Sequence, residues 1–475
     1  FYAVEKFAAN VLKTKNIINT AGFDPGHIWK RFADAQGIDG SINFNIRDIS
    51  KAKTILLNSA DIAVSHPVLW VEILKSIKNG AHLITAGPVD SFLDRYSTLR
   101  LKTKAGAETL LYHFLCRVLL DKEKEKIWES SENFNSVFNA LKNLDLSRVE
   151  NLTGISEKDL LKAGELLQER EPSFIFLGGE IVYSEEINCL FAGCWNLALI
   201  SRSRMIPLPL LSNQRGVEIV SGLPLDDRPD QKKFFQSVSS GEIEALYLNG
   251  PVILPDKIDI PVLIVQDSHW TDFAVKADAV LPAVTFAETD GTFVNMEGRI
   301  QYFQGSIPPL GESKPDWWIV KEIASRLKNN DLKYKKTADI TFELSRSIKA
   351  FQKVNYLELQ NGKDFFIHEK ENEDIKSNYV LIFPSKKREL PKGKNLFRLL
   401  LIPASDNYKN FLLGREIPGF KRIKDPEWIM IKPEEAEKAG FSDEDNVILR
   451  TDTGHFKGKL KYSNYIPENV IVSYY

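Results

Sequence analysis

The chain has 475 residues, enough for about two to four domains, and it is 43% hydrophobic, 27% charged and 11% aromatic. This composition is typical of a globular protein and excludes a disordered or fibrous chain. The 62 Lys and Arg residues nearly balance the 64 Asp and Glu residues, which gives a formal net charge of -2. Because nucleic-acid-binding proteins carry an excess or a stripe of basic residues, the charge argues against a nucleic-acid partner.

No apolar run approaches the ~18–20 residues that cross a bilayer, so contact with a membrane is expected only through another subunit. The three cysteines (Cys116, Cys189 and Cys194) are too few for a disulfide framework, which favours a reducing compartment. A protein-bound iron–sulfur cluster usually takes four thiolates, so this chain is not expected to hold one alone. Because it begins at Phe1 inside a helical pattern, we interpret the chain as the ordered remainder of a longer polypeptide.

Strand and helix signals alternate over residues 1–225. This order predicts βαβ units and a parallel sheet covered on both faces, which is a doubly wound, Rossmann-like α/β domain. Ser156 is predicted to cap a helix that follows it. The predicted strands are 54–57, 82–85 and 173–177, and the predicted helices are 4–12, 68–77, 109–120 and 157–168.

Residues 226–345 repeat this pattern and predict a second doubly wound α/β domain. Residues 346–394 alternate Lys and Glu densely, which indicates a solvated linker with a short strand at 379–383. Residues 395–475 predict a small β-barrel with a helix at 433–440. The further predicted elements are strands 245–248, 262–265, 279–281, 399–402 and 447–449 and a helix at 317–327.

The common catalytic signatures are missing from the sequence. There is no GxSxG, HExxH or GxxxxGK[ST] motif, and no cysteine pair has zinc-binding spacing. Cys189 and Cys194 lie on a helical pattern and are interpreted as buried small hydrophobic residues. Gly178 and Gly179 follow a predicted strand, where a glycine pair fits either a phosphate-binding turn or a simple tight turn.

One segment is far more specific. Residues 277–301, ADAVLPAVTFAETDGTFVNMEGRIQ, resemble the signature of the molybdopterin oxidoreductase family, which includes formate dehydrogenases, nitrate reductases and an iron–sulfur subunit of NADH-quinone oxidoreductase (complex I). Residues 56–88, 311–327 and 430–454 match other parts of the family in the same order. The resemblance covers nearly the whole chain and implies that 395–475 is a dinucleotide-binding barrel of the double-psi type. It also implies a preceding iron–sulfur region, outside this chain.

The metal-ligand position departs from the family pattern. Active members place Cys, selenocysteine, Ser or Asp a few residues after an opening helix such as 4–12. Asp24 falls at that position here, in a stretch without cysteine. A carboxylate beside Pro25 and Gly26 fits a metal ligand, as in nitrate reductases, and it also fits an ordinary turn.

The nucleotide-contact positions depart from the family as well. An Asp-Pro-Arg sequence is usual after the second strand, but this chain has Gly87-Pro88-Val89-Asp90. Glu297 and Arg299 are expected to form an ion pair that fixes the signature loop, either as a rigid corner or beside a cofactor. The residues left as remnants of a cofactor pocket are Asp24, Asn58, Gly178, Gly179, Asn213, Asp267, Asn295 and Arg299.

These departures lead us to expect a non-catalytic scaffold. The resemblance then implies the molybdopterin-fold part of the iron–sulfur subunit of NADH-quinone oxidoreductase, with no cofactor in this chain and iron–sulfur clusters elsewhere. Its partners would be the other subunits of the peripheral arm, on the cytoplasmic face of the membrane. The alternative is an active molybdenum or tungsten bis-pterin oxidoreductase, such as a formate dehydrogenase, that binds molybdopterin guanine dinucleotide with Asp24 on the metal. A third hypothesis is a redox-partner subunit of an electron-bifurcating hydrogenase or dehydrogenase.

Overall fold

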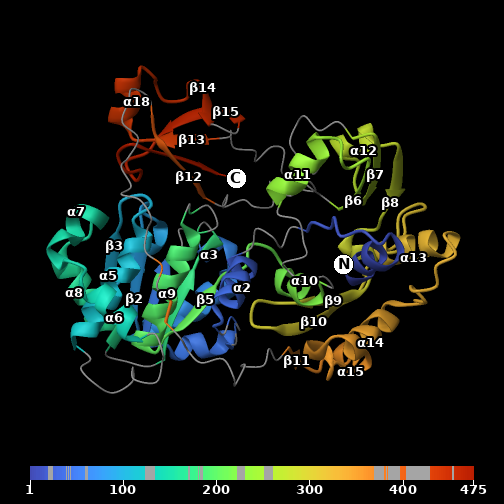
Figure 1. Ribbon diagram of the computed structural model, residues 1–475, viewed down its shortest axis with the longest axis horizontal. Coiled ribbons are helices and arrows are strands. Elements are labelled where there is room, and N and C mark those ends of the chain that lie inside the picture. The colour runs from blue at the N-terminus through green and yellow to red at the C-terminus, as the bar shows by residue number, and fades with distance from the viewer. Residues whose placement is uncertain are drawn as a thin grey trace. The chain divides into compact units, whose positions relative to one another are not determined.

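The chain forms two compact units, which Figure 1 shows in one view. One unit contains residues 1–27 and 211–367, and the other contains 28–210 together with the described residues from 379 onward. The computed structural model describes residues 1–19, 25–38, 40, 42, 44–58, 62–122, 134–168, 172–179, 181, 184, 186–221, 231–250, 260–367, 379–380, 382, 396–402, 428–451 and 454–474.

A five-stranded parallel sheet organises residues 28–210, with its strands in the order β3-β2-β1-β4-β5 (Figure 1). Every residue of β1 and β4 is buried, as expected for continuous apolar runs in a sheet covered on both faces. The strands are β1 Thr54–Asn58, β2 His82–Gly87, β3 Leu99–Lys102, β4 Ser173–Leu177 and β5 Arg204–Pro207.

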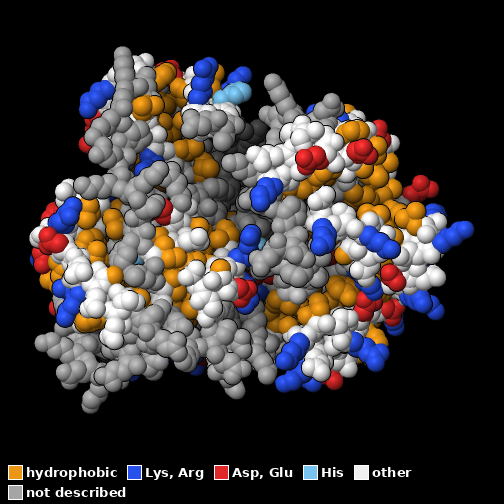
Figure 2. Space-filling model, in the orientation of Figure 1, with side chains coloured by type: hydrophobic (Ala, Val, Ile, Leu, Met, Phe, Trp, Pro, Cys, Tyr) orange, Lys and Arg blue, Asp and Glu red, His pale blue; other side chains and the backbone are white. Residues whose placement is uncertain are grey.

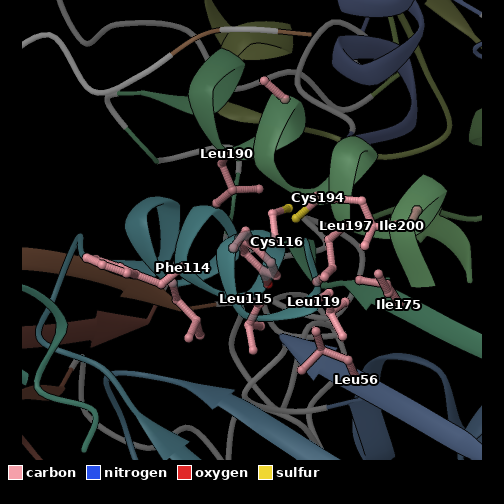
Figure 3. Packing of buried hydrophobic residues seen from close by; sticks show 14 of the residues in the cluster. Leu56, Phe114, Leu115, Cys116, Leu119, Ile175, Leu190, Cys194, Leu197 and Ile200 are labelled. Atoms are coloured by element: carbon pink, nitrogen blue, oxygen red, sulfur yellow. The ribbon is translucent and has the colours of Figure 1, made fainter. Parts of the chain in front are cut away.

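The core of this unit lies where α5 and α9 pack against each other and against the sheet (Figure 3). Cys116 of α5 and Cys194 of α9 point toward one another there, above Leu56 and Ile175 of the sheet. The helices are α2 Pro25–Gln36, which crosses the boundary between the units, α3 Ile62–Ser65, α4 Pro67–Lys78, α5 Glu108–Lys122, α6 Phe134–Lys142, α7 Val149–Thr153, α8 Glu157–Gln168 and α9 Ile187–Ser201. The Ser156 hydroxyl accepts from the Asp159 amide, so the predicted cap of α8 is confirmed.

The other unit contains a parallel sheet, β6-β7-β8, and an antiparallel sheet, β11-β10-β9. Helix α1 packs against α13 through Ala3, Phe7, Val320 and Ala324. The strands are β6 Ala245–Asn249, β7 Val262–Asp267, β8 Ala279–Pro282, β9 Gly291–Val294, β10 Arg299–Phe303 and β11 Phe365–Phe366. The helices are α1 Tyr2–Lys6, continued by a π-helical turn over Phe7–Val11, α10 Gln214–Val220, α11 Gln231–Ser239, α12 Asp272–Lys276, α13 Asp316–Arg326, α14 Thr337–Ser347 and α15 Tyr356–Gln360.

A mixed sheet in the order β12-β16-β13-β15-β14 forms the C-terminal part. One face of this sheet, with Met430, Val470 and Val472, packs against Val89 and Ala105 of the parallel-sheet region. Its elements are β12 Arg398–Ile402, β13 Trp428–Ile431, α18 Pro433–Ala439, β14 Asn446–Thr451, β15 Gly454–Tyr462 and β16 Val470–Tyr474.

The strand predicted at 379–383 is absent from its described residues, so that prediction is wrong. The Asn196 side chain takes the place of a neighbouring strand, because its Nδ2 donates to Val380 O at 2.8 Å and its Oδ1 accepts from Val380 N at 2.9 Å. His113 Nε2 lies 3.0 Å from Ile382 O. The side chains of α5 and α9 therefore hold this segment.

The predicted α/β class with parallel sheets is confirmed. Among the described residues, no helix combines the length and the apolar character that crossing a bilayer requires.

Candidate functional site

The strand order of the first parallel sheet points to one place for a ligand. The chain runs from β1 outward to β2 and β3, then returns to the other side of β1 with β4 and β5. The order therefore reverses between β1 and β4. Open α/β sheets bind ligands outside the carboxyl ends of the strands at such a reversal.

Three of the predicted residues meet at this reversal. Asn58 ends β1 and is 5% exposed, and Gly178 and Gly179 follow β4 directly and are buried. The amide of Gly178 donates to Asn58 O at 2.7 Å, which extends the pairing of the two strands by one residue. The sequence-based selection of Asn58, Gly178 and Gly179 thus falls on one small area.

Two further residues in this area were missed by the sequence reasoning. Tyr112 of α5 accepts from Asn58 Nδ2 through its hydroxyl at 2.8 Å, which fixes the Asn58 amide. Burial raises the pKa of Tyr112 well above its usual value, so the hydroxyl stays protonated. Gly87 ends β2 with a φ of 144°. A Cβ built at this position would lie 3.9 Å from Asn58 Oδ1, and no other described atom outside its chain neighbours would be within 4 Å. We define Asn58, Gly87, Gly178 and Gly179 as the first strand-end site.

The loop after β2 is closed by Arg100, another residue that the sequence reasoning missed. Its Nη2 donates to Gly87 O and Val89 O, both at 2.8 Å, and its Nε lies 3.2 Å from Asp94. Burial lowers the pKa of Arg100. The loop therefore has an acid, Asp94, and the next strand, β3, an arginine, but Arg100 binds the loop backbone and lies against Asp94.

The carboxyl end of the second parallel sheet carries Asp267 and, beside it, a polar network that converges on Asp316. Asp267 is 7% exposed, and its Oδ1 accepts from the His269 amide at 3.0 Å. The adjacent Gln266 is fully buried, accepts from the Tyr247 hydroxyl and donates to Asp316 Oδ1 at 2.6 Å. Asn249 Nδ2 donates to the same Asp316 oxygen at 2.9 Å. We define Asn249, Gln266, Asp267 and Asp316 as the second strand-end site.

Asn295 and Arg299 of the signature meet Asn213, which precedes α10, at the β9–β10 hairpin. Asn213 Oδ1 accepts from Val294 N at 2.9 Å, and Asn295 Oδ1 accepts from the amides of Glu297 and Arg299 at 3.1 and 2.9 Å. Gly298 has a φ of 81°, which the tight turn requires. Arg299 Nε donates to Asp364 Oδ1 at 2.9 Å. These side chains fix the corner that the signature forms.

The predicted metal-ligand position, Asp24, lies outside the described residues and is therefore not placed relative to these sites. Among the residues that the structure does describe, no group of three or more His, Cys, Asp or Glu side chains is arranged to hold a metal ion. All three cysteines are buried, as predicted for Cys189 and Cys194, and none of them forms a disulfide bond.

A family model for molybdopterin oxidoreductases matches residues 1–326, about two thirds of the sequence. The chain belongs to the molybdopterin oxidoreductase family. It is 24% identical, over 99% of its length and 78% of the relative's, to the F420-dependent formate dehydrogenase subunit alpha of Methanocaldococcus jannaschii. It is 26% identical to a putative formate dehydrogenase of Bacillus subtilis, over 77% of this chain and 42% of that one.

The structural comparison agrees on the fold. Acetylene hydratase from Pelobacter acetylenicus matches the whole chain with a TM-score of 0.80 and 14% identity, over 77% of its own length. The chain spans less than two thirds of the length of several of its curated relatives, such as the 42% of the B. subtilis protein.

These relatives overturn the expected function. The similar molybdopterin oxidoreductases are named formate dehydrogenases, so the assignment to a scaffold subunit of NADH-quinone oxidoreductase is wrong. The prediction that the chain has no active site conflicts with the same relatives. The prediction that it holds no cofactor is not supported either, since the family is that of the molybdopterin oxidoreductases. The two local departures, at 15–27 and 87–90, are outweighed by a similarity that extends along 99% of the chain.

Proposed function

We propose that this chain is the pterin-binding part of a molybdenum- or tungsten-dependent oxidoreductase that acts on formate. The observation that carries the proposal is the similarity to the alpha subunit of a formate dehydrogenase along 99% of the chain. The family membership supports the same cofactor class, a pterin that carries molybdenum or tungsten.

The first strand-end site fits such a cofactor. A phosphate group can come closest to backbone amides where no side chain stands in the way, as at glycine. Gly87, Gly178 and Gly179 supply such backbone at the ends of two strands. Asn58, held by Tyr112, supplies an oriented amide beside them. We propose that these residues hold the dinucleotide part of the cofactor. When bound, the cofactor would supply a metal that accepts two electrons from the substrate.

The remaining site residues have supporting roles in this proposal. Asn213, Asn295 and Arg299 fix the signature hairpin, and Asp267 ends a strand of the second sheet. Asp24 is the proposed metal ligand, because its carboxylate is a hard oxygen donor at the position where the family places that ligand.

The finer organisation also remains a proposal. The predicted domain bounds at 225 and 345 differ from those of the compact units, because residues 1–27 belong with 211–367. The predicted linker 346–394 contains α15 and β11, and this stretch packs in that unit through Leu359 and Ile367. The assignment of 395–475 to a barrel of the double-psi type remains our proposal. A partner subunit would take up the electrons, since the methanogen relative is itself a subunit. Iron–sulfur clusters in a region outside this chain would carry them. A cytoplasmic location, held near the membrane by partner subunits, belongs to the same proposal.

The decisive measurement is the metal content of the native holoprotein, purified without chelators, together with its formate oxidation by a viologen dye. We expect stoichiometric molybdenum or tungsten, and we expect Asp24→Ala to lose both the metal and the activity. Asp34→Ala is the matched control, since Asp34 is an exposed carboxylate on α2 that pairs with Lys30. Iron without either heavier metal in the wild-type protein would contradict the proposed function. Retention of metal and activity by Asp24→Ala would refute the role of Asp24.

A further inference from the structure

One face of strand β15 carries a row of basic side chains. Because successive residues of a strand point to opposite faces, His455, Lys457, Lys459 and Lys461 share one face. The alternate residues Phe456, Leu460 and Tyr462 belong to the apolar core on the other face. The basic row is therefore fixed by the same alternation that builds the core.

Strand β14 extends this face to the edge of the sheet. Arg450 is in register with His455 and Ile448 with Lys457. Arg450, Ile448, His455 and Lys457 are all exposed, and Ile448 is 51% exposed although it is a large apolar residue. We define Ile448, Arg450, His455, Lys457, Lys459 and Lys461 as the basic face. Figure 2 shows Lys, Arg and His side chains gathered over β14 and β15.

The charges of the basic face are not neutralised by their described surroundings. Within the described residues, Arg450, Lys457, Lys459 and Lys461 form no ion pair. The nearby Asp443 and Asp445 are engaged by backbone, since they accept from the amides of Tyr462 and Ser442, each at 2.7 Å. This concentration of charge contrasts with the whole chain, whose net charge is -2.

The basic face also continues a surface that is already used for packing. Met430 of β13 is in register with Lys461 and points to the same side of the sheet, where it packs with Val472 against Val89 and Ala105. Toward β14 the same side becomes basic and exposed. A face that is apolar where it is covered and basic where it is exposed is suited to a second, charged contact.

We propose that the basic face docks the acidic surface of a partner protein. Electrostatic complementarity of this kind steers association and fixes register, while an exposed apolar side chain adds a buried contact. Ile448 lies opposite Lys457 on the edge strand β14 and supplies that apolar contact. Single-stranded nucleic acid is less well matched, because its sites stack bases on aromatic rings, and the Trp428 ring of this face lies under Lys461 Nζ at 4.8 Å.

The test uses the whole chain and three fluorescent probes, poly-glutamate, a glutamate–tyrosine copolymer and a single-stranded oligonucleotide. Binding is measured by anisotropy at about 50 and about 300 mM salt, because screening should weaken a charge-driven contact. We expect both acidic polymers to bind, the copolymer more tightly because its rings contact Ile448, and the oligonucleotide to bind most weakly.

Charge reversal identifies the surface. We expect Arg450→Glu/Lys457→Glu/Lys459→Glu to weaken polymer binding by about tenfold or more at the lower salt concentration. The control Lys78→Glu/Lys158→Glu/Lys333→Glu changes the net charge equally at exposed positions elsewhere and should have little effect. Ile448→Ser should remove the advantage of the copolymer while leaving poly-glutamate binding unchanged.

Three results would overturn the proposal. Equal weakening by the two triple variants would show a general charge effect, and tighter binding of the oligonucleotide would show a nucleic-acid surface. An unchanged preference for the copolymer in Ile448→Ser would show that Ile448 makes no apolar contact with the bound chain. Circular dichroism and thermal melting of each variant establish that it is folded. Since no readout depends on metal or activity, failure here is distinguishable from failure of the proposed function.

Discussion

The carboxyl ends of the two parallel sheets carry different kinds of residue. The first strand-end site has glycine at three positions and one asparagine, held by Tyr112. The second strand-end site is filled by Asn249, Gln266 and Asp316, which bind one another. The first parallel sheet thus ends in glycine backbone without side chains, whereas the second ends in polar side chains that are hydrogen-bonded to one another. The first is suited to receive a ligand, and the second to fix the sheet against α13.

Replacing the amide at each end should separate binding from stability. Gln266→Leu leaves the Asp316 carboxylate with one donor fewer and the half-buried Tyr247 hydroxyl without its acceptor, so we expect a loss of about 2–3 kcal/mol in the free energy of unfolding. Asn58→Leu removes a neutral hydrogen bond and should cost about 1–2 kcal/mol. Urea unfolding measures both. We expect Asn58→Leu, but not Gln266→Leu, to lose bound pterin, and the reverse result would contradict the comparison.

A second test replaces one glycine by alanine at the carboxyl end of each parallel sheet. Gly87 has a φ of 144° and Gly250, which follows β6, has a φ of 78°. We expect Gly87→Ala to lower stability by about 1–3 kcal/mol and to reduce the pterin content of the holoprotein. Gly250→Ala is the matched control, costing about 1 kcal/mol and leaving the pterin content unchanged. Equal pterin loss in both variants would show that the effect is not specific to the first end.

His66 gives the first sheet a dependence on pH. It precedes α4, its Nδ1 lies 2.9 Å from Ser65 Oγ, and burial lowers its pKa to about 4. Because the unfolded chain binds a proton near pH 6.5 and the folded chain does not, stability is full above pH 6.5 and falls as the pH drops toward 4. We expect a loss of about 2–3 kcal/mol over that window, because a shift of one pKa unit corresponds to about 1.4 kcal/mol. His66→Gln should flatten this part of the pH profile, and an unchanged slope would exclude His66 as its source.

The smallest effect is expected at the signature hairpin. Arg299 pairs with the half-exposed Asp364, and exposed ion pairs contribute about 0–1 kcal/mol. Arg299→Ala should therefore change the unfolding midpoint only slightly at low salt and not at all at high salt. A loss above about 2 kcal/mol would mean that Arg299 has a larger role than fixing the corner.

The sequence predicted elements whose signals are local. Strand β4 coincides with a run of five apolar or small residues, and α8 follows the predicted cap Ser156. Tyr112 and Arg100 were missed because they meet Asn58 and Gly87 through the fold, and no spacing in the sequence reports such contacts. The segment at 379–383 was misassigned because its continuous apolar run is typical of a buried strand, whereas Val380 pairs with the side chain of Asn196. Asp24 stays a prediction.

The packing of α1 on α13 cannot form until most of the chain has been synthesised. About 310 residues separate these helices in the chain, so a ribosome adding about 5–20 residues per second needs roughly 15–60 s to deliver the second after the first. During that interval Ala3 and Phe7 have no α13 to cover them. In the nascent chain these apolar side chains therefore stay exposed, and accessible to chaperones, until α13 has been synthesised and can bury them.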